Sequence, residues 1–317
     1  MMMNIVSKKA VVFAYHSIGV RCIQVLLARQ MDIALVITHQ DNPNETIWFD
    51  SVSALCAEHD LPVIQPDHGD IPDLHARIQA IDPDFIFSFY YRYMLPMSLL
   101  GLARGGAYNL HGSLLPKYRG RVPVNWAVLH GETETGVTLH EMAEKPDAGA
   151  IIAQTAVPIL PDDTAFQVFN KLTVAAEQTL WRVVPDLIQG TPPRFSNVLE
   201  QGSYFGGRRP EDGRIDWSQS AQNVYNLHRA VAPPYPGAFT ELAGHIFTIA
   251  TARLARSMLS SAKHLPLGLT ISDNRIFGRC GDGQSLVIQD LLMDQRPIST
   301  EQLRTLFSSC SPDRILS

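Results

Sequence analysis

Short apolar runs alternate with segments of helical spacing through the first half of the chain. The apolar runs predict strands at residues 10–15, 32–38, 61–65 and 85–90. Between them, apolar residues recur at helical spacing over residues 18–30, 47–59 and 72–80. Strands and helices that alternate through such short connections predict an α/β fold with a doubly wound, mostly parallel sheet. Ligands on such sheets bind beyond the carboxyl ends of the strands.

The second half of the chain changes character after a long amphipathic segment. Residues 165–188 predict a single helix that ends at Gly190, because Pro192 and Pro193 follow. Beyond Gly237 short β-like runs predominate, at residues 238–242, 246–250, 267–271 and 286–292. We therefore expect two domains, a larger α/β domain over residues 1–201 and a smaller β-rich C-terminal domain over residues 202–317.

The composition narrows the class of protein. Of the 317 residues, 45% are hydrophobic and 18% are charged, which is typical of a soluble globular protein. The net charge of −5 does not suggest the basic surface of a nucleic-acid-binding protein. The four cysteines are scattered without the spacing of a metal site, so we expect neither a metal nor a disulfide framework. The sequence shows no signal peptide and no membrane-spanning stretch, which predicts a cytoplasmic protein.

Three polar residues near the middle of the chain are candidates for chemistry. Asn109 and His111 lie two positions apart behind an apolar stretch, so their side chains share one face of an extended strand. Asp147 lies in a turn-like Pro-Asp-Ala-Gly segment that precedes another apolar strand. An Asn, a His and an Asp at the ends of strands suit an acyl-transfer site.

The residues around these three resemble a known family. The motif Asn109-x-His111-x-Ser113-Leu114-Leu115-Pro116, followed by Asp147, resembles the 10-formyltetrahydrofolate-dependent formyltransferases. Longer runs look like the formyltransferase part of ArnA, which acts on UDP-4-amino-4-deoxy-L-arabinose in the lipid A modification of lipopolysaccharide. These runs are residues 12–16, 38–43, 87–92, 131–140, 215–217 and 236–239.

The resemblance implies the formyltransferase fold and a set of site residues. The catalytic residues would be Asn109, His111 and Asp147. The residues that bind the folate would be Tyr93, Met94, Leu95, Arg121, Ala143, Glu144, Lys145, Pro146 and Asp147. The co-substrate would be 10-formyltetrahydrofolate, with no metal. The acceptor would be the amine of UDP-4-amino-4-deoxy-L-arabinose or of a close relative, and a homodimer stays open.

Formyl transfer to an amine needs a neutral amine, a stabilised oxyanion and a proton for the departing folate nitrogen. Histidine titrates near neutrality, so His111 suits the proton transfer. The amide of Asn109 can donate to the developing oxyanion. Asp147 can orient His111 and raise its pKa. No Ser or Cys is placed as a nucleophile, so we expect no covalent intermediate.

Other polar residues have simpler interpretations. We expect His39 and His140 to be structural. Three arginines are candidates for contacts to a diphosphate: Arg208, Arg209 and Arg229. Three further basic residues could meet the folate glutamate or a substrate phosphate: Lys117, Arg119 and Arg121.

Three other functions compete with this one. A methionyl-tRNA formyltransferase would use the same chemistry on a tRNA, but residues 41–50 are acidic and lack the basic insertion of that enzyme. Pro210 also stands where that enzyme has a lysine. A hydrolase that releases formate would not need the long second domain. A non-enzymatic sugar-nucleotide-binding protein would not need Asn109, His111 and Asp147 together.

Overall fold

The structure is a computed structural model that describes residues 7–43, 45–66, 71–255 and 266–309. The chain forms two compact units that interleave along the sequence. Unit 1 comprises Met1–Pro123, Glu134–Pro158 and Phe169–Gly206. Unit 2 comprises Val124–Thr133, Ile159–Val168 and Gly207–Ser317.

Unit 1 is built on a sheet of seven strands in the described part of the chain, in the order β3-β2-β1-β4-β5-β7-β8. The strands are β1 (Lys9–Ala14), β2 (Asp32–Ile37), β3 (Val63–Ile64), β4 (Phe85–Phe89), β5 (Ala107–His111), β7 (Glu134–Glu141) and β8 (Ile151–Pro158). The first five are parallel, whereas β7 and β8 each run antiparallel to the neighbour before them. Strands β2 and β3 lie on one side of β1. Strands β4 and β5 lie on its other side. The order therefore reverses between β1 and β4, which is where ligands bind in doubly wound sheets.

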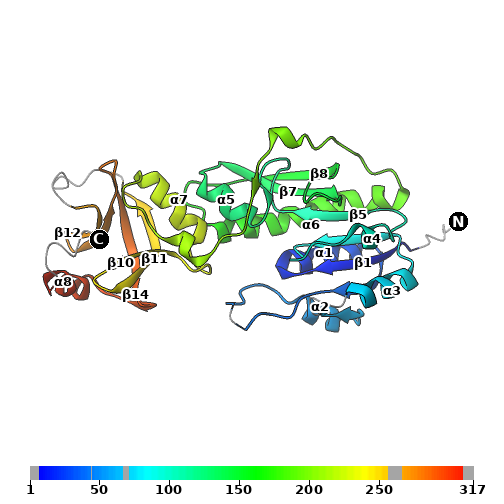
Figure 1. The fold of residues 1–317 in the computed structure, drawn as a ribbon, viewed down its shortest axis with the longest axis horizontal. Helices are drawn as coiled ribbons and strands as arrows, with labels where there is room; N and C mark the ends of the chain where they lie inside the picture. Colours follow the sequence, from blue (N-terminus) through cyan, green and yellow to red (C-terminus); the bar gives the residue numbers. More distant parts are fainter. Residues whose placement is uncertain (1–6, 44, 67–70, 256–265, 310–317) are drawn as a thin grey trace. The chain divides into compact units, whose positions relative to one another are not determined.

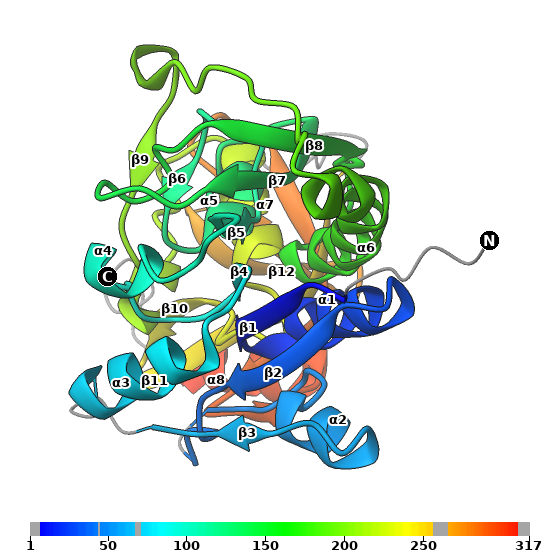
Figure 2. The ribbon, with the colours of Figure 1, turned by 90° about the vertical axis from the view of Figure 1, so that its right-hand side faces the viewer.

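Helices cover both faces of this sheet (Figures 1 and 2). One face carries α1 (His16–Ala28), α2 (Val52–Glu58) and most of α6 (Ala165–Gln189), and the other carries α3 (Ile71–Ile81) and α4 (Met97–Leu100). The core under α3 and α4 joins Leu74 and Ile78 to side chains of β1 and β2. Parallel strands that are buried on both faces consist of continuous apolar runs, so they can be predicted from the sequence. The predicted mixed α/β fold with a large, mostly parallel sheet is confirmed.

One predicted helix begins later than expected. The helical spacing over residues 47–59 predicts a helix from residue 47, but α2 begins only at Val52. The Ser51 hydroxyl caps it by accepting from the Ala54 N–H at 3.2 Å. The rings of Trp48 and Phe49 pack instead on the imidazole of His16. These two residues are part of a local aromatic cluster and not of a helix.

Unit 2 holds an antiparallel sheet in the order β10-β11-β14-β13-β12, with β15 paired to β14. Its strands are β10 (Ala238–Leu242), β11 (His245–Leu254), β12 (Gly268–Ser272), β13 (Arg275–Arg279), β14 (Ser285–Met293) and β15 (Arg296–Pro297). The helices of this unit are most of α5 (Pro123–Leu129), α7 (Ala221–Val231) and α8 (Thr300–Ser309), with a 3-10 turn at Pro210–Gly213. The predicted β-rich character of the C-terminal part is confirmed.

Two further observations bear on the expectations from sequence. No helix among the described residues is long and apolar enough to cross a membrane. Cys22, Cys56 and Cys280 are buried free thiols, whereas Cys310 lies outside the described residues.

The core of unit 1 should be most sensitive at β4. Phe87 is 0% exposed and its ring stacks on that of Phe89, so Phe87→Ala should lower the free energy of unfolding by about 3–5 kcal/mol. Phe195→Ala is the matched control, because that ring is 59% exposed and its loss should change the free energy by less than about 0.5 kcal/mol. Urea unfolding of both variants checks the difference. Equal effects would contradict this assignment of the core.

Candidate active site

The candidate residues from the sequence lie at the carboxyl end of β5. Asn109 and His111 point to one face of this strand, while Tyr108 and Leu110 are buried on the other. Asp147 lies in the loop between β7 and β8. The antiparallel pairing places the start of that loop beside Tyr108, and the loop folds back along β5 so that Asp147 lies 3.5 Å from His111.

His111 is held from both sides. Its Nε2 lies 2.7 Å from the carbonyl oxygen of Tyr118, and its Nδ1 lies 3.5 Å from Oδ1 of Asp147. A carbonyl oxygen only accepts, so Nε2 carries the hydrogen and donates it to Tyr118. The neutral ring therefore presents an unprotonated Nδ1 on the side of Asp147. The distance of 3.5 Å exceeds that of a hydrogen bond, so the carboxylate leaves this nitrogen free to react.

The carboxylate of Asp147 has three partners. Its Oδ2 accepts from the N–H of Gly120 at 2.8 Å, and its Oδ1 faces the imidazoles of His111 and His140. Burial acts to raise the pKa of this group, but His111, His140 and the Gly120 N–H lower it to about 2. Asp147 is therefore ionised at neutral pH.

Burial has the opposite effect on the imidazole. Desolvation of the buried ring lowers the pKa of His111 below its ordinary value, although the charge of Asp147 acts to raise it. The sequence led us to expect a raised pKa, because burial cannot be read from the motif. His111 is therefore neutral at neutral pH and ready to accept a proton.

His140 joins this cluster, although the sequence analysis gives it a structural role. Its Nδ1 lies 2.8 Å from the Glu141 carbonyl, so this nitrogen donates. Its Nε2 then accepts from the amide of Asn109, 3.0 Å away, and lies 3.5 Å from Asp147 Oδ1. Asn109 and His140 are direct cross-strand partners in the β5–β7 pair. The register of that pair would have revealed the contact.

The loop that carries Asp147 is clamped by a residue distant in the sequence. Asp147 has a left-handed backbone, with φ of 51°. The side-chain amide of Asn197 donates to the carbonyls of Asp147 and Gly149, both at 3.0 Å. A Cβ at Gly149 would overlap the Glu141 carbonyl, so this position needs glycine. No sequence motif points to Asn197.

The residues expected to bind folate follow three strand ends. Tyr93, Met94 and Leu95 follow β4, whose Ser88 is the sheet partner of Asn109. Arg121 is exposed and follows the two-residue strand β6 (Arg119–Gly120). Ala143, Glu144, Lys145 and Pro146 lead from β7 to Asp147. Of this set, Asp147 contacts His111 and His140.

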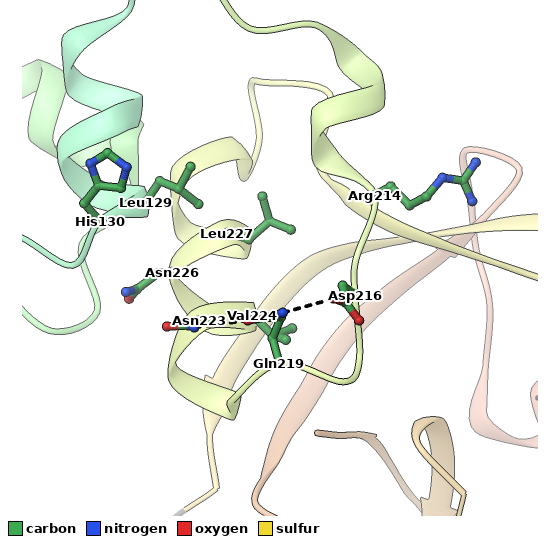
Figure 3. Close-up of a pocket in the computed structure, with 9 residues that line it drawn as sticks. All are labelled: Leu129, His130, Arg214, Asp216, Gln219, Asn223, Val224, Asn226 and Leu227. Atoms are coloured by element: carbon green, nitrogen blue, oxygen red, sulfur yellow. Dashed lines mark hydrogen bonds between the residues drawn. The ribbon is translucent and has the colours of Figure 1, made fainter. Parts of the chain in front are cut away.

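One pocket lies elsewhere, in unit 2. It measures about 450 Å³ and is lined by Leu129, Leu227 and polar side chains that include Arg214 and Asp216 (Figure 3). Its charged groups already have partners, since Arg214 pairs with Glu241 and Asp216 accepts from Ser218 and Gln219. A pocket of about 330 Å³ in unit 1 borders β8 and includes Phe195. Neither contains the clustered titratable groups, so we take the His111 cluster as the site.

No group of three or more His, Cys, Asp or Glu in the described ranges is arranged to hold a metal ion. The cluster contains proton-transfer and hydrogen-bonding groups, and its arrangement suits acyl transfer to an amine without a covalent intermediate.

Comparison with known families agrees with this chemistry. The model of the formyl transferase family matches residues 8–184, and that of the formyl transferase C-terminal domain matches residues 208–305. The chain belongs to the formyl transferase family and is an enzyme that transfers a formyl group.

Solved structures show the same fold. One is WlaRD, a sugar 3N-formyl transferase solved in the presence of dTDP and 5-N-formyl-THF. It is 19% identical with a TM-score of 0.69, and the match covers 89% of this chain and 97% of that one. Another is the N-formyltransferase from Helicobacter canadensis with folinic acid and dTDP-3-aminofucose, 19% identical with a TM-score of 0.68, over 89% and 99% of the two chains. A 4-N formyltransferase from Francisella tularensis is 20% identical with a TM-score of 0.59, over 74% and 92%.

The protonation of His111 can be measured directly. We expect its NMR titration to have a midpoint below the ordinary 6.5, because burial lowers its pKa. Asp147→Asn should move the midpoint further down, since it removes the negative charge that favours the imidazolium. The His111→Gln spectrum identifies the signal among the eleven histidines. A midpoint above 6.5 would contradict the burial argument.

Proposed function

We propose that this chain transfers the formyl group of 10-formyltetrahydrofolate to the amine of a nucleotide-linked amino sugar. UDP-4-amino-4-deoxy-L-arabinose or a close relative is the acceptor that the ArnA-like runs favour. The observation that carries the proposal is the cluster of Asn109, His111 and Asp147 at the end of β5. WlaRD and the Helicobacter canadensis enzyme, which act on sugars, support the acceptor class.

Asn109 stabilises the oxyanion in this mechanism. When the amine attacks the formyl carbon, negative charge develops on the formyl oxygen. One N–H of the Asn109 amide is donated to His140, which leaves the other N–H for that oxygen. A single donor of this kind stabilises the transition state by roughly 3–4 kcal/mol. His140 acts as a positioning residue, because it fixes which way the Asn109 amide faces.

His111 moves the proton. The attacking amine becomes more acidic as its bond to the formyl carbon forms, and Nδ1 of His111 accepts its proton. The imidazolium is stabilised by Asp147, 3.5 Å away, and held in place by Tyr118. It then donates to the folate nitrogen as the bond between that nitrogen and the formyl carbon breaks. The products are the N-formylated sugar and tetrahydrofolate.

The proposed acceptor also suggests a pathway, a location and an assembly for the chain. Formylation of UDP-4-amino-4-deoxy-L-arabinose places the chain in lipid A modification, and we propose a cytoplasmic homodimer that binds no nucleic acid.

The roles of Asn109 and His140 predict two different losses. Asn109→Ala should lower kcat by roughly 10²–10³-fold, with little change in KM, because the oxyanion loses its donor. His140→Phe should lower kcat by up to about tenfold, the effect of one neutral hydrogen bond that orients Asn109. Steady-state kinetics measures both, and near wild-type turnover of Asn109→Ala would remove it from the mechanism. In the double variant the His140 change should add little, because its target is gone.

A tRNA acceptor is the second candidate, and the fold of the acidic segment weighs against it. Two carboxylates of this segment have partners within unit 1. Asp41 accepts from the Tyr15 hydroxyl at 2.7 Å, and Glu45 pairs with Arg92 at 2.7 Å. Glu45 thereby neutralises an arginine, and the chain as a whole carries a net charge of −5. Binding to tRNA phosphates would need an excess of positive charge.

The acceptor is tested with radiolabelled 10-formyltetrahydrofolate. We expect formyl transfer to UDP-linked or dTDP-linked 4-amino sugars and none to methionyl initiator tRNA. Transfer to the sugar should change only modestly with salt, whereas binding to several tRNA phosphates would weaken by roughly 0.7–0.9 log units per contact for each log unit of salt. Efficient tRNA formylation would overturn the acceptor class. Release of free formate alone would indicate a hydrolase.

A further inference from the structure

The backbone around Arg119 is part of the candidate active site. The peptide group before Arg119 supplies the Tyr118 carbonyl that accepts from His111. The peptide group after Arg119 supplies the Gly120 N–H that donates to Asp147. The Cα of Arg119 therefore lies between the peptide groups that contact His111 and Asp147, and its long side chain starts beside the proposed reaction centre.

This short segment is firmly held. Strand β6 pairs in parallel with β9 (Tyr204–Phe205), where Arg119 N–H donates to Ser203 O and Arg121 N–H to Phe205 O. Gly120 has φ of 94°, and a Cβ there would overlap the Phe205 carbonyl. The start of the Arg119 side chain is thus fixed relative to His111 and Asp147.

The guanidinium of Arg119 lacks a partner. Within the described residues it forms neither an ion pair nor a hydrogen bond, and its Nε is enclosed by protein atoms. Four other arginines of unit 1 each pair with a carboxylate: Arg21, Arg92, Arg104 and Arg194. Buried donors are almost always paired in folded proteins, so an unpaired arginine beside a reaction centre is typical of a site that a ligand completes.

We propose that Arg119 binds the diphosphate of the nucleotide-linked acceptor; this inference rests on the proposed function. A guanidinium binds phosphate oxygens through parallel hydrogen bonds and does not lose its charge. In the acceptor a single sugar ring separates the amine from the diphosphate. The carboxylates of the folate lie further from the formyl group, beyond its aminobenzoyl ring. An arginine that starts beside His111 therefore meets the diphosphate first.

Two of the three arginines first considered for the diphosphate, Arg208 and Arg229, have other contacts. Arg229 is 4% exposed and donates to the Asp163 carbonyl and to the Asn226 side chain. Arg208 lies over the ring of Trp126 and donates to the Asp212 carbonyl. These contacts stabilise unit 2, whereas the Arg119 guanidinium has no such role.

The test compares Arg119→Gln and Arg119→Lys with the wild-type chain. Calorimetry measures the binding of UDP and of dTDP, and kinetics measures KM for the amino-sugar nucleotide and for 10-formyltetrahydrofolate. Arg77→Gln is the control, because Arg77 is exposed on α3 and its loss changes the net charge equally. We expect Arg119→Gln to weaken diphosphate binding and raise the acceptor KM by roughly 10- to 100-fold, with the donor KM unchanged. Arg119→Lys should recover part of the affinity.

Thermal unfolding separates binding from structure. Because the Arg119 side chain has no partner among the described residues, Arg119→Gln should melt at or above the wild-type temperature. A marked loss of stability would show a structural arginine and overturn the proposal. A raised donor KM with an unchanged acceptor KM would assign Arg119 to the folate carboxylates, and no change in either would exclude both.

The two proposals fail in distinguishable ways. If UDP or dTDP binding depends on Arg119 but no amino sugar is formylated, the diphosphate site stands and the proposed acceptor falls. If formyl transfer to another amine occurs while the wild-type chain binds neither nucleotide, the formyl chemistry stands and the diphosphate site is overturned.

Discussion

The buried charge of Asp147 is the constraint on which the rest of the site depends. A carboxylate away from water is costly unless hydrogen bonds and opposite charges compensate it. Here the hydrogen bond comes from the Gly120 N–H at 2.8 Å, and an opposite charge comes when the His111 imidazole, 3.5 Å away, takes up a proton. The contacts of Asp147 with both imidazoles fix where His111 and His140 lie. The pKa of about 2 for Asp147 reflects how fully they favour its charged form.

The segments that contact the Asp147 carboxylate are themselves held by pairing and by hydrogen bonds. The Gly120 N–H that donates to Asp147 lies in β6, which pairs with β9 beside the stacked rings of Tyr118 and Phe205, 5.4 Å apart. On the other side, Asn197 keeps the 147–149 turn in a conformation that few residues adopt. The two-residue strands β6 and β9 and the side-chain amide of Asn197 therefore hold the residues of the candidate site in position.

The sequence predicts the frame of the protein better than the details of the site. Buried parallel strands are continuous apolar runs, so β1 and β4 could be located within a residue. The Asn109-x-His111 spacing predicts a shared face, which the structure shows. His140 and Asn197 could not be predicted, because their contacts depend on the β5–β7 register and on a loop that returns from far along the chain. The predicted start of α2 was wrong, because Trp48 and Phe49 pack on His16 and not on a helix face.

The hydrogen-bond partners assign the protons of the two imidazoles. The Tyr118 and Glu141 carbonyls each take an N–H, which leaves His111 with a free Nδ1 and His140 with a free Nε2. The Asn109 amide donates to the second of these nitrogens, and the proposed mechanism therefore uses Nδ1 of His111 to accept the proton of the substrate. Protonation of His111 neutralises the Asp147 charge instead of adding a net charge to the interior. Because burial lowers the pKa of the His111 imidazole, it favours the proposed release of the proton to the leaving folate nitrogen.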